Sequence, residues 1–244
     1  MRPLITAFGL LVGWEALVWA AGVPAYILPP PSRVLTVLVE RFDLLLAEAA
    51  WTAVEMLIGL ALGLLLGAAL AIVFAASAGW RRWALPLVIV SQAIPVIAIA
   101  PLLVVWLGYG LASKVVMAAL VIFFPVVSTL YDGLRHTDQG WLDLARTMDA
   151  SPRATLLQIR LPAALPAFAS GARIAAAVAP IGAVIGEWVG ASAGLGYLMT
   201  LSLARGQTAL AFAALIVLCL LGLALYYATD WLARVLVPWQ SQGE

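Results

Sequence analysis

The chain has 244 residues, of which 65% are hydrophobic and only 10% are charged, and its formal net charge is +1. A soluble domain carries about 25% charged residues, so this composition excludes a soluble globule, and the high hydrophobicity excludes a disordered chain. A single lysine, histidine and cysteine provide neither a basic surface for nucleic acid nor an internal disulfide. The remaining class is an integral membrane protein.

The N-terminal part begins with an apolar run, Leu4 to Ala21, that is long enough to cross a bilayer and carries one charge, Glu15. Its length and its weakly basic flank favour a retained span over a cleaved signal peptide. Three prolines follow, and Ser32 is predicted to cap the next helix. Residues 33–48 are too charged to span, so we predict an amphipathic helix at a membrane surface.

Three further spans are predicted in the central part. Thr52 to Ser77 has glycine at every fourth position over one stretch, a pattern that lets another helix approach closely. A short charged turn, Gly79 to Trp83, separates it from the third span, Ala84 to Leu107. That span contains three prolines, which membrane helices tolerate where neighbours satisfy the freed carbonyls. The fourth span covers Ser113 to Tyr131.

Residues 132–170 form the most polar segment of the chain and separate the fourth span from the fifth, Gly171 to Val189. A glycine- and serine-rich stretch at 190–196 precedes the sixth span, Leu210 to Trp231. The predicted fold is therefore all-α: one polytopic membrane domain over residues 1–244 with six transmembrane helices.

Arginine and lysine are distributed unevenly between the two sides of these spans. With the N-terminus inside, nine fall on the inside and four on the outside. The outer four are Arg33, Arg41, Lys114 and Arg205. Since positive residues accumulate in cytoplasmic loops, both termini and the 132–170 loop are predicted to be cytoplasmic.

Two short helices are predicted within this loop, over residues 141–148 and 153–160. Ser151 and Pro152 suit the cap and the first position of the second helix, and Pro162 is expected to end it. Such a helix pair makes a compact knob that can dock into a groove on a partner. The alternative is an ordinary solvated loop.

The loop resembles a cytoplasmic motif of permease subunits of ATP-binding cassette importers, which reads Glu-Ala-Ala, three residues, Gly, nine residues, Ile, one residue, Leu-Pro. Asp149 replaces the motif glycine, and a left-handed turn is expected there because Asp tolerates it better than most residues. By this resemblance, coupling to the ATPase is assigned to Asp143, Ala145, Arg146, Asp149, Ile159, Leu161 and Pro162.

Other segments resemble particular branches of this permease family. Ile27 to Ser32, and Glu187 followed by Gly194 to Tyr197, are similar to the nitrate, sulfonate and taurine branch. Gln92 to Pro95 and Pro180 to Trp188 are similar to permeases for thiamine precursors of the hydroxymethylpyrimidine type. The resemblance implies import of such a precursor, with an alkanesulfonate, taurine or nitrate permease as the alternative.

The family resemblance also implies a homodimer in a bacterial inner membrane, two ATP-binding cassette subunits docked on the knobs, and a periplasmic or lipid-anchored substrate-binding protein. Lys114 follows no phosphate-binding loop, so ATP and Mg²⁺ are expected in the partner subunit, with no cofactor, metal site or enzyme activity in this chain. An ATP-independent secondary transporter would need inverted repeats and ion-coupling groups at midplane, and the sequence indicates neither.

Three residues are candidates for the translocation pathway. Glu187 in an apolar run either lines a pathway or is a structural carboxylate bonded to backbone at a helix end. Gln92 lies about one turn before Pro95 and could offer polar groups to a heteroaromatic ring, unless Pro95 only kinks its helix. Glu15 and Glu55 are predicted to be structural.

Overall fold

The computed structural model of the chain describes residues 2–239, which contain helices and no strands, so the all-α fold class is confirmed. The elements are α1 (Arg2–Ala21), α2 (Pro31–Glu40), α3 (Phe42–Ala76), α4 (Ala78–Ala93), α5 (Val96–Leu107), α6 (Leu111–Arg135), α7 (Gln139–Thr147), α8 (Pro152–Ala154), the π-helix η1 (Thr155–Arg160), α9 (Leu161–Gly190), α10 (Leu195–Ala204) and α11 (Thr208–Leu236).

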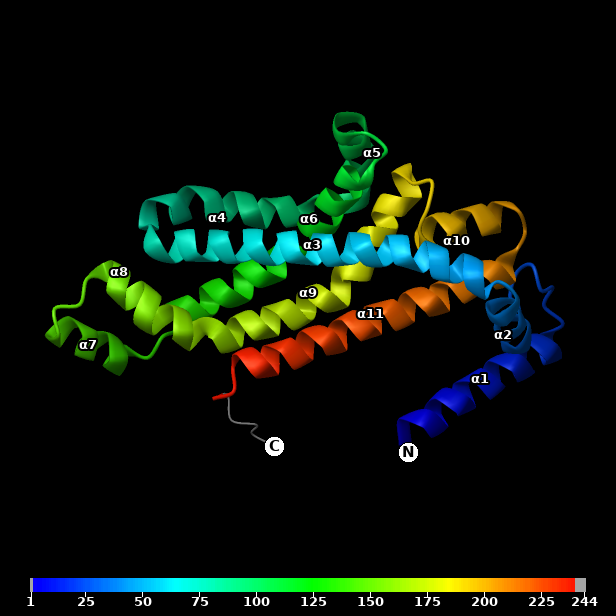
Figure 1. Cartoon of the computed structure of the whole chain (residues 1–244), viewed down its shortest axis with the longest axis horizontal. Helices are drawn as coiled ribbons and strands as arrows, with labels where there is room; N and C mark the ends of the chain where they lie inside the picture. The colour runs from blue at the N-terminus through cyan, green and yellow to red at the C-terminus, as the bar shows by residue number, and fades with distance from the viewer. Residues whose placement is uncertain (1, 240–244) are drawn as a thin grey trace.

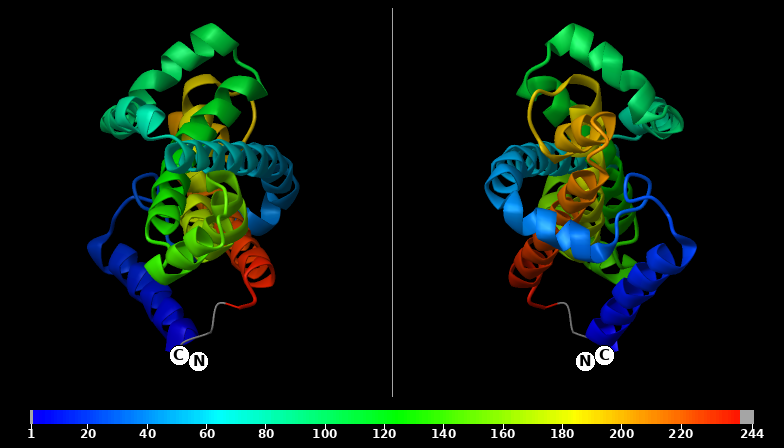
Figure 2. Two further views of the ribbon diagram at one scale, coloured as in Figure 1. Left: turned by 90° about the vertical axis from the view of Figure 1, so that its left-hand side faces the viewer. Right: turned by 90° about the vertical axis from the view of Figure 1, so that its right-hand side faces the viewer.

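Helices α3, α6, α9 and α11 form a bundle along the long dimension of the molecule (Figure 1). Helices α7 and α8 lie at one end, here called the knob end, and α2 and α10 lie at the other, here called the far end. Helices α3, α6 and α11 run towards the knob end, whereas α9 runs away from it. Helix α1 diverges from the bundle in both views of Figure 2.

Four helical segments are long and apolar enough to cross a membrane: Phe42–Ala76, Leu111–Arg135, Pro152–Gly190 and Thr208–Leu236. The pair α4 and α5 adds a fifth candidate if it is one broken span. In α1, the part whose side chains the structure describes continuously, Gly9–Ala21, is an apolar helix. The multi-pass fold is therefore shown, and the count of six spans stays a prediction.

The glycines of α3 allow the close packing of α3 on α6 that their spacing predicted. A Cβ atom added at Gly59 would lie 2.5 Å from the Ala118 side chain, and one at Gly67 would lie 2.7 Å from that of Val126. Gly63 likewise faces Ile122 with no room for a methyl group. The backbone of α3 thus contacts the side chains of α6 directly.

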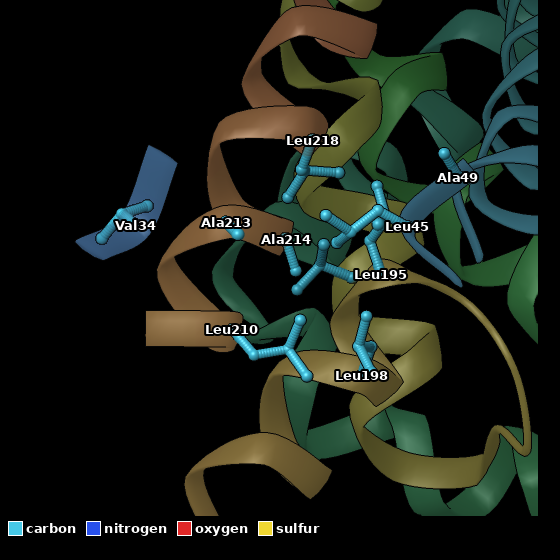
Figure 3. Packing of buried hydrophobic residues seen from close by; sticks show 10 residues of the cluster. Val34, Leu45, Ala49, Leu195, Leu198, Leu210, Ala213, Ala214 and Leu218 are labelled. Carbon is cyan, nitrogen blue, oxygen red and sulfur yellow. The ribbon is translucent and has the colours of Figure 1, made fainter. Parts of the chain in front are cut away.

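Helix α10 packs its apolar side chains between α3 and α11 at the far end (Figure 3). Leu195 and Leu198 of α10 contact a buried cluster that includes Leu45 of α3 and Leu218 of α11. Val34 places α2 against the same cluster. This second layer closes the far end of the bundle.

Two expectations for the N-terminal part are wrong. Ser32 does not cap α2: the cap residue is Pro30, and Ser32 instead donates its backbone N–H and hydroxyl to the carboxylate of Glu15, at 3.0 and 2.9 Å. Residues 33–48 are not one helix, because the chain breaks at Arg41, where the backbone leaves helical geometry, and α3 begins at Phe42.

The third predicted span also differs. Residues 79–83 are helical rather than a turn, because the hydroxyl of Ser77 accepts a bond from Trp80 N and caps α4. The helix then breaks after Ala93 and bends by 102° into α5. Pro95, which has no N–H to continue the helix, stands at that break as the cap residue of α5.

Pro162 does not end the second loop helix. It lies inside the continuous helical segment Pro152–Gly190, directly after the π-helix η1. The segment between α6 and α9 is therefore 136–160, shorter than the predicted 132–170. Helix α10 was not predicted at all, because its ten residues are too few for a span.

We predict that Gly63→Val lowers the free energy of unfolding by about 2 kcal/mol or more, because the added methyl groups overlap Ile122 on α6. Reversible denaturation in detergent measures the change. Gly13→Val is the matched control, since Gly13 has no atom near its Cβ position. Equal stability of both variants would contradict the packing described for α3.

Candidate functional site

The knob end is built by two capped helices. The carboxylate of Asp138 accepts a hydrogen bond from Trp141 N at 3.3 Å and caps α7. Ser151 Oγ accepts from Ala154 N at 3.2 Å and caps α8, with Pro152 at the first helical position. The Ser151 cap confirms the predicted start of the second loop helix.

The turn between these helices depends on Asp149. Its φ angle is +52°, the only positive φ of a non-glycine residue in the described chain. Asp149 N donates to Arg146 O at 3.1 Å, and Ala150 N donates to Ala145 O at 3.0 Å, which closes α7. The left-handed turn expected for an Asp at the motif glycine is therefore confirmed.

The knob is tied to the bundle through Arg160 of η1. Its guanidinium donates two hydrogen bonds to Leu134 O, from Nε at 3.0 Å and from Nη2 at 2.7 Å. Leu134 lies in the last turn of α6, where carbonyls have no helical partner. One side chain thus pairs an orphan carbonyl and fixes the angle between α6 and the knob.

An apolar groove of about 400 Å³ lies on the knob. Its lining includes Trp141, Leu144, Met148, Ile159, Pro162 and Trp239. Trp141, Leu144 and Met148 are exposed, with 55 to 74% of their surface accessible. An exposed apolar groove next to charged side chains is typical of a protein-binding surface.

The residues assigned to coupling differ in their surroundings. Asp143 and Arg146 are exposed and form an ion pair at 2.7 Å. Ala145 is buried, and it lines the groove together with Ile159 and Pro162. Leu161 is half-buried against the core that surrounds Phe74 and Leu130. Their role in coupling stays a prediction.

Glu187 lies near the end of α9 and is 1% exposed. Its carboxylate accepts hydrogen bonds from Thr52 Oγ1 at 2.6 Å and from Gly196 N at 2.5 Å. Thr52 Oγ1 accepts a bond from Leu195 N at 2.8 Å, and Glu48 accepts one from Gly194 N at 2.5 Å. The backbone N–H groups of Gly194, Leu195 and Gly196, at the start of α10, are therefore paired with side chains of α3 and α9.

This arrangement corresponds to the structural alternative for Glu187, a carboxylate bonded to backbone at a helix end. Gly194 and Gly196 leave the space it occupies, since a Cβ atom at either position would collide with the carboxylate. Gly194 also has φ +111°, which other residues rarely adopt. A role of Glu187 in the pathway stays a prediction.

Sequence reasoning missed the partner of Glu55. Lys114 Nζ lies 3.1 Å from Glu55 Oε1, and both residues are buried, at 7 and 1% exposed. Lys114 comes from α6 and Glu55 from α3, with Glu187 of α9 close enough to act electrostatically on Glu55. The only lysine of the chain, placed beside an apolar run, was the one signal available in the sequence.

Gln92 and Pro95 do not share the surroundings of Glu187. Both are exposed at the bend between α4 and α5, and Gln92 donates only to the hydroxyl of its neighbour Ser91, at 3.3 Å. The alternative in which Pro95 kinks its helix corresponds to the observed bend. The three pathway candidates thus do not form one site within this chain.

Comparison with known proteins decides the class of this molecule. The family described as "Binding-protein-dependent transport system inner membrane component" matches residues 45–242. The chain belongs to this family. The groove and the capped knob of the permease lie within the matched residues.

Several relatives align over nearly the whole permease. A "Probable ABC transporter permease protein" of Haemophilus influenzae is 51% identical, over 95% of both chains. "Formylaminopyrimidine transport permease protein ThiX" of Halalkalibacterium halodurans is 35% identical over 99% of this chain and 97% of its own. "Riboflavin transport system permease protein RibX" of Chloroflexus aurantiacus is 37% identical over 97 and 89%. Two relatives at 28 and 27% identity are named for the transport of aliphatic sulfonates and of taurine.

The fold also matches a solved structure titled for inward facing conformations of the MetNI methionine ABC transporter. The TM-score is 0.64 at 23% identity, and the match covers 82% of this chain and 98% of the other. The permease is a membrane component of transport rather than an enzyme, as its relatives are.

We predict that Lys114→Met lowers the free energy of unfolding by about 3 kcal/mol, because it leaves the buried Glu55 carboxylate without its counter-charge. The double variant Glu55→Gln/Lys114→Met is expected to recover part of that loss, since the Glu55 side chain is then uncharged while the buried Glu187 carboxylate keeps its hydrogen bonds from Thr52 and Gly196. Chemical denaturation in detergent measures both.

Arg146→Met is the matched control for this prediction, because it breaks the exposed pair with Asp143 and is expected to change stability by less than about 1 kcal/mol. A Lys114→Met variant as stable as wild type would show that the pair contributes nothing.

Proposed function

We propose that the permease works as a homodimer that imports a hydroxymethylpyrimidine-type thiamine precursor, with two ATP-binding cassette subunits docked on its knobs and a periplasmic or lipid-anchored protein delivering the substrate. The observation that carries this proposal is the 35% identity, over almost the full length of both chains, to a relative named for formylaminopyrimidine transport. ATP and Mg²⁺ are bound by the partner subunit, and this chain supplies the moving helices.

The knob groove supports the docking of the ATP-binding subunit. Leu144 and Met148 offer exposed apolar surface, and the ion pair of Asp143 with Arg146 lies beside them on α7. Because Arg160 ties η1 to the last turn of α6, a push on the knob is transmitted to both α6 and α9. The partner's closure on ATP can therefore move two spanning helices at once.

We predict that Leu144→Glu reduces co-purification of the ATP-binding subunit by about tenfold, because docking would then desolvate a carboxylate. Pull-down from membranes, with the permease quantified separately, measures the loss. Leu157→Glu is the matched control, an exposed leucine of the same segment outside the groove. Retention of the partner by Leu144→Glu would mean that the groove is not the docking surface.

Orientation with both termini in the cytoplasm of a bacterial inner membrane is part of the proposal. The helix directions agree with this orientation. Helix α11 runs towards the knob end, and α1 begins nearer to the knob end than α2 lies (Figure 1). Lys114 is buried in its ion pair, so one of the four positive charges counted on the outer side is neutralised. On the inner side Arg146, Arg173 and Arg234 are paired with aspartates, so the sequence count of nine against four remains the basis of the proposed orientation.

Single cysteines in a Cys219→Ala background test this orientation. Arg153→Cys on the knob and Ser192→Cys in the loop before α10 are both at exposed positions. We expect an impermeant thiol reagent to label only Ser192→Cys on intact cells and to label Arg153→Cys after the inner face is opened. Labelling of Arg153→Cys on intact cells would reverse the proposed orientation.

The substrate proposal also rests on charge. No arginine or lysine of the described residues is both buried and unpaired: Lys114 pairs with Glu55, and Arg173 of α9 pairs with Asp230 of α11 at 2.6 Å. A small pyrimidine needs hydrogen-bond partners and an apolar path more than a cationic clamp. A sulfonate, taurine or nitrate permease is the second candidate, supported by relatives with those names.

Growth separates the two substrates. In a strain that cannot synthesise the pyrimidine, deletion of the permease should abolish growth on low external precursor, and the wild-type protein should restore it. The matched control is growth of the same deletion strain on an alkanesulfonate as sulfur source, which should be unaffected. The reverse pattern, normal precursor uptake with loss of growth on the sulfonate, would assign the permease to the second candidate.

A further inference from the structure

Part of the groove on the knob comes from outside the knob helices. Besides residues of α7, η1 and the start of α9, its lining includes Trp239, which follows the end of α11. Trp239 is 58% exposed and Trp141 of α7 is 55% exposed, so two large aromatic rings from distant parts of the sequence border the same groove. The segment after α11 therefore contributes to the surface on which a partner would dock.

The position of Trp239 is fixed by the packing of the residues before it. Val237 is 4% exposed and belongs to a buried cluster with Ala169 of α9 and Ala233 of α11. Its backbone N–H donates to Ala233 O at 3.0 Å. Pro238 then restricts the backbone between this anchor and Trp239, because the proline ring fixes φ. The exposed ring thus follows a buried anchor on α9.

An ion-pair cluster joins α11 to α9 close to this anchor. Arg173 Nε of α9 donates to Asp230 Oδ1 at 2.6 Å, and Arg234 Nη2 lies 2.8 Å from Asp230 Oδ2. Both oxygens of the carboxylate are therefore paired, and Asp230 is less than two turns before the end of α11. A partner that contacts Trp239 acts on α11 directly and on α9 through this cluster.

We propose that Trp239 is a contact residue for the ATP-binding subunit, an apolar side chain of which packs against the rings of both Trp239 and Trp141. The inference rests on the docking of that subunit at the knob groove. A tryptophan at the edge of an apolar groove offers a large contact area and is the residue type that most often dominates the binding energy of an interface. Closure of the ATP-binding subunit then moves α11 together with α6 and α9.

A tryptophan after a span can also lie in the aromatic belt at the membrane surface. Trp231 suits that role: it is 64% exposed, lies about two turns earlier on α11 and does not line the groove. Trp239 differs because it lines the groove with residues of α7, whose exposed ion pair of Asp143 and Arg146 would be costly in lipid. This position favours a protein partner for Trp239.

Co-purification of the ATP-binding subunit with the full-length permease tests the contact. Trp239→Ala should reduce the amount of bound subunit by about fivefold, since a large apolar contact is lost. Trp239→Phe should keep most of the binding, because an aromatic ring remains in the groove. Trp231→Ala is the matched control, an exposed tryptophan of α11 outside the groove, and it should bind the subunit as wild type does.

Photo-crosslinking provides a second measurement that does not depend on the strength of binding. A photoreactive phenylalanine analogue in place of Trp239 should crosslink to the ATP-binding subunit, and the same analogue in place of Trp231 should not.

Leu144→Glu, measured in parallel, separates this inference from the docking proposal. Loss of the subunit in Leu144→Glu, with normal binding by Trp239→Ala and no crosslink from position 239, would overturn the role of Trp239 and leave the groove as the docking surface. Normal binding by both variants would overturn the docking proposal itself. Stronger binding by Trp239→Ala would show that the ring obstructs the groove, which also overturns the inference.

Discussion

The far end of this permease depends on one constraint, that the free N–H groups at the start of a helix need hydrogen-bond partners where water is scarce. Glu15 of α1 accepts from the first turn of α2, and Glu48, Thr52 and Glu187 accept from the first turn of α10. The partial positive charge of each helix start in turn stabilises the carboxylates. Acidic residues that look costly in apolar segments therefore hold the short helices in place.

The sequence predicted the fold where a single physical property decided the structure. Apolar length placed α3, α6, α9 and α11, and the glycine spacing of α3 predicted its packing on α6. The bend after Ala93 was missed because a proline in a membrane helix is compatible with either a mild kink or a full break of the helix. Helix α10 was missed because ten apolar residues become a helix here only through contacts with α3, α9 and α11.

The features of the candidate sites also differ in whether the sequence could predict them. The left-handed turn at Asp149 and the cap at Ser151 were predictable, because both depend on neighbouring backbone alone. The pairing of Lys114 with Glu55 was not, since the two residues are brought together only when α3 packs on α6. For Glu187 the sequence left two alternatives open, because its hydrogen-bond partner Thr52 is distant in the sequence.

The π-helix η1 has a consequence for the knob. A π-turn contains about one residue more than an α-turn, and one residue corresponds to about 100° of rotation in an α-helix. The side of the molecule towards which the knob faces is therefore determined by a whole number of residues in Thr155–Arg160, not by a continuous angle. The number of residues between Asp149 and Ile159 therefore sets the direction in which the knob faces as well as its distance from α9, and one inserted residue would rotate an intact knob relative to the bundle.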